Sequence, residues 1–174
     1  MRILQVITSL QTGGAEKIVV DITRIMKARG HIVDVVVFNG VDTPFMEDIR
    51  KTGCKVFSFS DGGSVYNPLY ILRLAGIMKK YDVVHSHNTS PQFFVAAANL
   101  LSGLPIVTTE HNTTNRRRNN PLWKPLDKWM YKRYKRIICI SDQAEQNLKE
   151  YLGHCNTPIN IIYNGVDVDL IYSS

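Results

Sequence analysis

The feature that most constrains this 174-residue sequence is a regular alternation of short β-branched runs with longer segments of helical spacing. Several runs are almost wholly apolar, which is typical of parallel strands in a sheet that helices cover on both faces. The repeated order of strand and helix indicates βαβ units with right-handed crossovers. The sequence therefore predicts an α/β fold, a Rossmann-like doubly wound parallel sheet of about seven strands. The expected strands are 3–7, 32–38, 55–59, 83–87, 106–109, 137–140 and 159–163.

Short polar residues mark the expected helix starts. A capping side chain followed by proline at the first helical position is a helix-start signature. Ser141 is a further cap candidate, and the segment 122–134 has helical spacing with a stripe, including Leu122 and Met130, that is expected to face the core. The first helix carries Ile18, Ile22 and Ile25 on one stripe. The cap-proline pairs are Thr43-Pro44, Asn67-Pro68, Ser90-Pro91 and Asn120-Pro121.

Composition narrows the class of protein. Apolar residues make up 44% of the chain, as in ordinary globular domains, and no run approaches the roughly 18 apolar residues of a membrane span. The first residues are too quickly polar for a signal peptide. The three cysteines are far apart and odd in number, which fits neither a disulfide framework nor a zinc site. A reduced, cytoplasmic compartment is the expected location.

The net charge of +6 is concentrated in one segment. Residues 116–136 hold nine lysines or arginines and one acidic residue, Asp127. Such local basicity indicates an anionic partner, although a solvated helix face would look the same. Aromatic residues interleave with the charges, a pattern that also fits contact with the inner face of a membrane. Nucleic-acid binding is the alternative from another class, but no nucleic-acid module is recognisable and none is expected.

The turn after the first strand is a candidate anion site. In doubly wound sheets, ligands bind beyond the carboxyl ends of the strands, where the strand order reverses. Gly13 and Gly14 stand there, between a strand and a helix, where a backbone without Cβ can come close to a phosphate at the positive end of the helix dipole. Neither the dinucleotide fingerprint nor a P-loop is present, so a tight turn alone is the competing interpretation. Glu16, in the first helical turn, is expected to be structural.

Three histidines are expected near the same edge of the sheet. His85 and His87 are two residues apart on the fourth strand and therefore share a face, and His111 follows the fifth strand. A metal site is a weak alternative, because the nearest carboxylate, Glu110, should point away from His111. One histidine facing the cleft suits acid-base or hydrogen-bonding work better. For His85 and His87, a buried histidine with satisfied hydrogen bonds remains the competing interpretation.

Five motifs in register resemble one known family. They are GGAE at 13–16, DVVHSHN at 82–88, IVTTEHNTT at 106–114, RIICISDQAEQNL at 136–148 and INIIYNGVD at 159–167. Their order and spacing resemble the N-terminal domain of a GT-B glycosyltransferase, and most of all the retaining family 4 enzymes. The resemblance runs through nearly the whole chain. It extends, more vaguely, to enzymes of capsular or surface-polysaccharide synthesis.

The resemblance implies metal-independent transfer of a sugar from a nucleotide-diphosphate donor, with no cofactor and with retention of configuration. It places Gly13 and Gly14 at the donor diphosphate and His111 at the donor sugar. Further residues would line the cleft or meet a saccharide or lipid-linked acceptor, which such N-terminal domains hold. These residues are His87, Asn88, Asn112, Arg116, Arg117 and Arg118. A sugar-nucleotide epimerase is a weaker alternative, because the complete dinucleotide fingerprint is missing.

The same resemblance defines the expected domain organisation. Residues 1–163 would form the acceptor-side domain, and residues 164–174 would begin the crossover to a second, donor-binding domain. Most of the family's donor site, including a basic pair and two glutamates, lies in that second domain and has no counterpart in these 174 residues. The chain alone is therefore expected to lack transferase activity.

Overall fold

The structure, a computed structural model, describes residues 1–111, 118 and 120–165. Its strands are β1 (Arg2–Ile7), β2 (Ile32–Asn39), β3 (Val56–Ser60), β4 (Val83–His87), β5 (Ile106–Glu110), β6 (Arg136–Cys139) and β7 (Ile159–Ile161). Its helices are α1 (Gly14–Ala28), α2 (Pro44–Lys51), α3 (Leu69–Met78), α4 (Thr89–Ser102), the 3₁₀ turn η2 (Pro121–Trp123), α5 (Lys124–Arg133) and α6 (Asp142–Leu152).

The seven strands form one parallel sheet in the order β3-β2-β1-β4-β5-β6-β7. The predicted fold class is therefore confirmed, and all seven predicted strands are present, with their ends shifted by at most two residues. The order reverses direction between β1 and β4, so the carboxyl ends of these two strands flank the position where this fold binds ligands.

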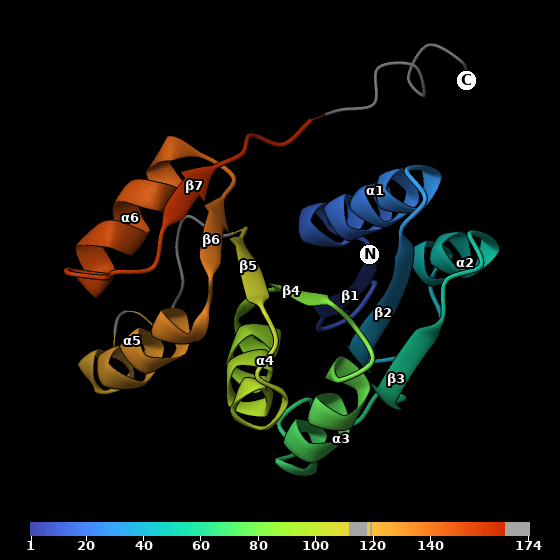
Figure 1. The fold of residues 1–174 in the computed structure, drawn as a ribbon, viewed down its shortest axis with the longest axis horizontal. Helices are drawn as coiled ribbons and strands as arrows, with labels where there is room; N and C mark the ends of the chain where they lie inside the picture. Colours follow the sequence, from blue (N-terminus) through green and yellow to red (C-terminus); the bar gives the residue numbers. More distant parts are fainter. Residues whose placement is uncertain (112–117, 119, 166–174) are drawn as a thin grey trace.

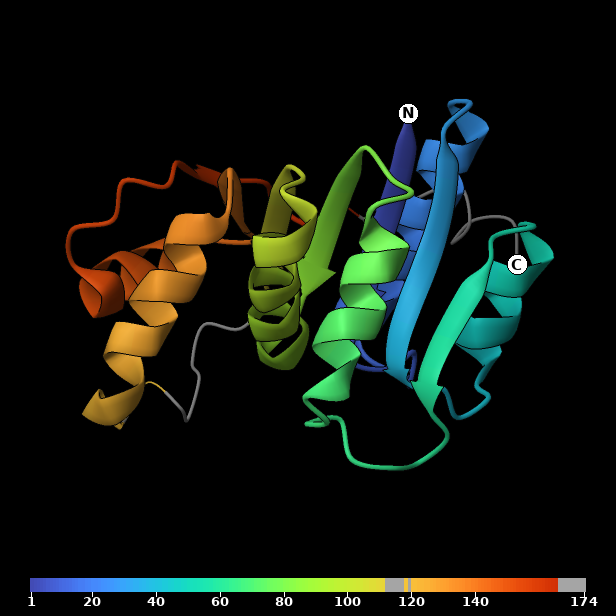
Figure 2. The same cartoon turned by 60° about the horizontal axis from the view of Figure 1, so that its bottom comes forward.

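Helices cover both faces of the sheet. Helices α1 and α2 lie on one face over β1 and β2, and α3 to α6 lie on the other (Figure 1). Strand β1 shows why both faces are apolar: Leu4 and Val6 belong to the core under α3 to α6, whereas Ile3 and Ile7 belong to the core under α1 and α2. Figure 2 shows α3 and α5 beginning at the sheet edge toward which the arrowheads of β2 and β3 point. Among the described residues, no helix is long and apolar enough to cross a bilayer.

The polar caps predicted most of the helix starts. Thr43 and Ser141 accept hydrogen bonds from the backbone N–H of the third residue beyond each of them, at 3.2 Å in both helices. The prediction of a cap at Ser90 is wrong. Helix α4 already begins at Thr89, with Asn88 as its N-cap, so Ser90 and Pro91 lie within its first turn.

Helix α5 begins later than predicted. Residues 121–123 form the 3₁₀ turn η2, capped by Asn120, and the α-helix starts at Lys124. Met130 is buried as expected, but Leu122 is 83% exposed and is not part of the core. The 3₁₀ turn has three residues per turn rather than 3.6, and it therefore rotates Leu122 out of the stripe that an α-helix would have formed.

The isoleucine stripe of α1 has an unexpected environment. The fully buried residues of this helix are Val19, Val20 and Thr23, whereas Ile25 is half exposed. The stripe lines one wall of an open groove of about 640 Å³ between α1 and the uncovered face of β4 to β6. The floor of that groove includes His85 and Thr109. The α1 face of the sheet is therefore accessible beside the histidines.

Candidate functional site

His87 connects three neighbouring strands at the carboxyl edge of the sheet. Its Nε2 lies 2.8 Å from Oε1 of Gln5 on β1, and its Nδ1 lies 2.9 Å from Nε2 of His111, just beyond β5. His87 itself is fully buried at the end of β4. Because β4 lies between β1 and β5, one side chain on it can reach both neighbours. The predicted proximity of His87 and His111 is thereby confirmed.

His85 lies on the same face, one alternation earlier. Its Nε2 is 2.7 Å from Oγ1 of Thr109, and its ring centroid lies 4.0 Å from that of His87. Burial lowers the pKa of His85 to about 3 and that of His111 to about 4, and burial also holds the pKa of His87 well below its usual value. The three imidazoles are therefore neutral near pH 7. They suit hydrogen bonding to a neutral ligand better than attraction of an anion.

The backbone is strained directly after His87. Asn88 has φ 68° and ψ 158°, and it is the one non-glycine residue with positive φ in the described part of the chain. This region is almost restricted to glycine, and a residue held there costs roughly 1–3 kcal/mol. Such strain is concentrated at functional sites, so the observed outlier supports the prediction that Asn88 faces the cleft.

The glycine turn forms the start of α1. Gly13 is the N-cap, with an extended backbone at φ −170°, and Gly14 is the first helical residue. A Cβ on Gly13 would lie 2.3 Å from Oε2 of Glu16, whereas a Cβ on Gly14 would meet no atom within 4 Å. Gly13 thus leaves room for the Glu16 carboxylate near the helix N-terminus, where the dipole favours it. The packing of the described chain gives no reason for a glycine at position 14.

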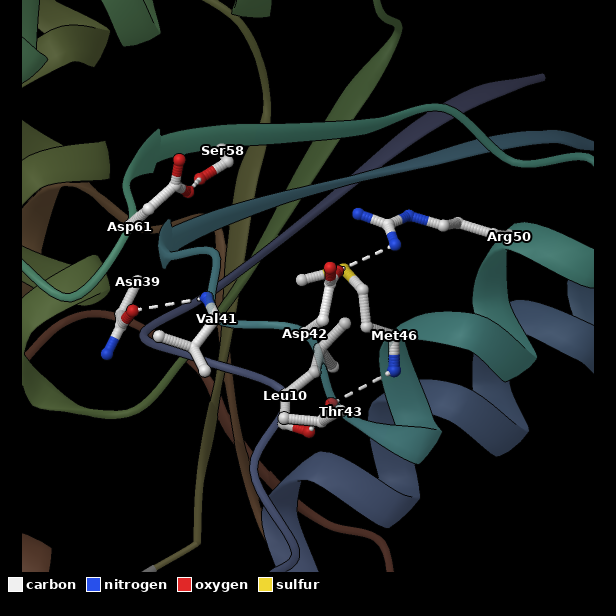
Figure 3. Close-up of polar contacts among 9 residues, drawn as sticks. All are labelled: Leu10, Asn39, Val41, Asp42, Thr43, Met46, Arg50, Ser58 and Asp61. Carbon is white, nitrogen blue, oxygen red and sulfur yellow. Dashed lines mark hydrogen bonds and ion pairs between the residues drawn. The ribbon is translucent and has the colours of Figure 1, made fainter.

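A polar contact from the next loop fixes the glycine turn in place. The hydroxyl of Thr43 donates to the carbonyl oxygen of Leu10 at 2.6 Å and accepts from the N–H of Met46 at 3.2 Å, and Figure 3 shows Thr43 between these two residues. Leu10 is fully buried. On the far side of this loop, Asn39 accepts from the N–H groups of Val41 and Gly62. The loops after β1, β2 and β3 are therefore held together by side-chain to backbone hydrogen bonds.

The basic segment is less accessible than predicted at one position. Nη2 of Arg118 lies 3.1 Å from Oε2 of Glu110, and both side chains are at least 90% buried. The hydroxyl of Tyr131 donates to the same carboxylate at 2.5 Å. Because a buried carboxylate needs such partners, Arg118 has a structural role here. Its contacts give no support to the prediction that it meets an acceptor.

The structure also shows site residues that the sequence did not single out. Gln5 and Thr109 each hold one histidine of the cluster, and Gln5 could have been noticed as the one polar residue in the apolar run Ile3–Ile7. The predictions for Asn112, Arg116 and Arg117 lie outside the described residues. Among the residues that are described, no group of three His, Cys, Asp or Glu side chains could hold a metal ion.

These features define a class of protein. A parallel sheet with this strand order, a glycine turn before the first helix and a polar cluster at the neighbouring strand ends is the Rossmann-like arrangement on which nucleotide-using enzymes are built. The sequence profile of Glycosyltransferase Family 4 matches residues 12–170, and the chain belongs to this family.

Individual relatives agree with this assignment. EpsF of Bacillus subtilis (strain 168), provisionally named a glycosyltransferase, is 26% identical over 97% of this chain. Phosphatidyl-myo-inositol mannosyltransferase of Mycobacterium tuberculosis (strain CDC 1551 / Oshkosh) is 27% identical over 93% of it. The crystal structure of Anabaena HepE in complex with UDP and glucose matches 98% of the chain with a TM-score of 0.79 at 22% identity, which shows the fold. The chain spans about half the length of these proteins, 46% of EpsF, 43% of the mannosyltransferase and 46% of HepE.

Proposed function

We propose that the chain forms the acceptor-side half of a retaining, metal-independent hexosyltransferase that uses a nucleotide-diphosphate sugar. The observation that carries the proposal is the pair of hydrogen bonds that join His87 with Gln5 and with His111. Through it, the imidazole predicted to meet the donor sugar is fixed next to the strand that leads into the glycine turn. The HepE structures, which contain UDP with glucose or UDP-glucose, support a nucleotide-sugar donor.

The described residues would divide the work as follows. When the bond between the sugar and the diphosphate breaks, negative charge develops on the diphosphate, and fixed dipoles stabilise it. The N-terminal end of α1 at Gly14 presents free N–H groups and open space for that charge. Glu16 would have to turn aside from Gly13, which its flexible side chain permits. His111, neutral by burial, would orient a donor hydroxyl rather than act as a nucleophile.

Substitution of His111 in the protein that carries this chain together with a donor-binding half tests the proposal. His111→Ala is expected to lower kcat/KM at least about tenfold, which corresponds to about 1.4 kcal/mol of transition-state stabilisation. The assay follows sugar transfer from UDP-glucose and related donors in the presence of a chelator. Near-normal transfer by the variant would refute the role of His111, and activity that requires added metal would refute the metal-independent mechanism. Turnover by the 174-residue chain alone would contradict its assignment as an incomplete half.

We further propose that the acceptor is lipid-linked and lies at the inner face of the cytoplasmic membrane, because of the surface at the start of the basic segment. Leu122 and Trp123 are 83% and 42% exposed, and they lie in the 3₁₀ turn η2 directly before the basic helix α5. An exposed apolar pair beside lysines suits insertion among anionic headgroups. The name of the mycobacterial relative, a phosphatidyl-myo-inositol mannosyltransferase, supports a role in glycolipid synthesis, and surface-polysaccharide synthesis is the wider form of the proposal.

Sedimentation with liposomes separates membrane contact from a merely solvated basic face. The chain should pellet with vesicles rich in anionic lipid at low salt, and less with neutral vesicles. Leu122→Ser combined with Trp123→Ser should reduce pelleting, while Leu101→Ser, which removes an exposed leucine from α4, serves as the control. No pelleting of the unaltered chain would end the membrane proposal and leave the transferase proposal intact.

A further inference from the structure

The hydrogen bonds in the row Gln5–His87–His111 determine which ring nitrogens of the two histidines carry protons. Both ring nitrogens of His87 are engaged, one by an amide oxygen and one by another imidazole. At the far end of the row, Nδ1 of His111 is buried and has no hydrogen-bond partner among the residues that the structure describes. Buried polar atoms without partners are rare in native proteins, and each one calls for an explanation.

The chemistry of the partners determines which atom donates and which accepts in each hydrogen bond of the row, and we call this the direction of the row. A neutral imidazole carries one N–H and one lone pair, and burial keeps His87 and His111 neutral. The amide oxygen of Gln5 can only accept, so Nε2 of His87 must carry the proton. Nδ1 of His87 is then a lone pair, and the proton of the second hydrogen bond must belong to Nε2 of His111. Nδ1 of His111 is left as a lone pair that accepts no hydrogen bond from any described residue.

We infer that Gln5 and His87 are positioning residues that fix the tautomer of His111 and make its Nδ1 a hydrogen-bond acceptor for a hydroxyl group of the sugar. The inference rests on the proposed function for the identity of the ligand, but not for the direction of the row. It narrows the ligand chemistry, because the group that meets Nδ1 must donate. A sugar hydroxyl satisfies this requirement, whereas a fluorine or an ether oxygen at the same position does not.

The neighbouring histidine does not belong to this row. His85 stacks beside His87, but its Nε2 is bonded to Thr109. The orientation of the Gln5 amide group therefore determines which nitrogen donates in each hydrogen bond of the row. If the NH₂ group of Gln5 faced His87 instead, every proton in the row would move to the other side, and Nδ1 of His111 would become a donor.

Nuclear magnetic resonance of the 174-residue chain labelled with ¹⁵N-histidine distinguishes the two proton arrangements, and it does not require an assay of enzymatic activity. We expect the shared proton to show a one-bond coupling to Nε2 of His111 and a coupling through the hydrogen bond to Nδ1 of His87. The preference should be about tenfold or more, as expected for one buried hydrogen bond. A proton bonded to Nδ1 of His87, or a protonated Nδ1 in His111, would overturn the inference.

A matched pair of substitutions tests whether Gln5 is the cause. Gln5→Met keeps the length of the side chain and removes its acceptor, so the reversed arrangement should rise to a population that is directly detectable. Gln92→Met is the control, because Gln92 is equally buried, at 1% exposure, and donates to Thr108 on the opposite face of the sheet. An unchanged proton position in Gln5→Met would refute the role of Gln5. The same change in both variants would show that it arises from general destabilisation, and it would refute that role as well.

The consequence for the ligand has its own readout. In the protein with its donor-binding half, Gln5→Met should raise KM or lower kcat for UDP-glucose. The effect should shrink for the UDP-deoxyfluoroglucose in which fluorine replaces the hydroxyl that meets Nδ1 of His111. If the proton lies where we infer but Gln5→Met leaves the kinetics unchanged, the direction of the row stands and the contact with the sugar is refuted.

Discussion

The three neutral imidazoles should make the stability of this domain depend strongly on pH. In the unfolded chain each has a pKa of about 6.5, whereas burial lowers the pKa of His85 to about 3 and that of His111 to about 4. Below pH 6.5, the unfolded chain therefore takes up protons that the folded chain does not. The free energy of unfolding should consequently fall as the pH is lowered through 6.5 toward 4, and it should be constant above about pH 7.5.

The magnitude follows from the size of these pKa differences. At pH 5, an imidazole that stays neutral in the folded state but has a pKa of 6.5 in the unfolded state costs about 2 kcal/mol. His85 and His111 together would then cost about 4 kcal/mol between pH 7.5 and pH 5, and His87, whose pKa burial also lowers, adds to this. The free energy of unfolding of a single domain is about 5–15 kcal/mol in total, so a loss of this size should be readily measurable.

Urea unfolding followed by circular dichroism at pH 7.5, 6 and 5 measures this loss. His85→Gln should reduce the dependence on pH by about 2 kcal/mol at pH 5, since it removes one of the imidazoles that resist protonation. His154→Gln is the matched control, because it removes an exposed imidazole and leaves the cluster intact. Equal stability at pH 7.5 and pH 5, within about 1 kcal/mol, would refute the burial of the histidines as neutral groups.

Three further substitutions test the backbone around the site, each by urea unfolding. Gly14→Ala should leave stability unchanged or raise it by up to about 1 kcal/mol, because no atom lies within 4 Å of the added Cβ, and a clear loss would show an unrecognised packing constraint. Thr43→Val should cost about 1–3 kcal/mol, since it removes the cap of Met46 and leaves the Leu10 carbonyl unpaired, whereas Thr43→Ser should cost less. Asn88→Gly should stabilise by about 1 kcal/mol through release of the positive φ; destabilisation would mean that contacts of the amide outweigh the strain.

The fold could be predicted from the sequence because its signals are local and repeated. Each apolar run corresponds to one strand of the sheet. The fixed handedness of βαβ crossovers then leaves few topologies for seven such strands. Errors arose where two local structures share one pattern. The spacing around Leu122 is compatible with an α-helix, but the capped proline after Asn120 starts a 3₁₀ turn first. The stripe at Ile18, Ile22 and Ile25 would look the same whether it faced a core or an open groove.

The candidate site could be predicted only in part. The proximity of His87 and His111 could be predicted because the carboxyl ends of adjacent parallel strands must meet at one edge, whereas their roles stay predictions. Arg118 was assigned from the family resemblance and from its charge, and neither shows whether a guanidinium faces solvent or pairs with a buried Glu110. The strain at Asn88 depends on how α4 joins β4, which is a property of the assembled fold.

The contact between His87 and Gln5 shows why the finer arrangement requires the sheet. These residues are separated by 82 positions in the chain, and they meet because β4 pairs with β1 across the point where the strand order reverses. In the register of that pair, Gln5 lies beside His85, and Val6 lies beside Ser86. His87 is thus two residues beyond the partner of Gln5 on the same face, within reach of a long side chain but not of a short one. Asparagine at position 5 would fall short of Nε2. The direction of the hydrogen bonds in the histidine row therefore depends on the one methylene group by which glutamine is longer than asparagine at position 5, which precedes His87 by 82 residues.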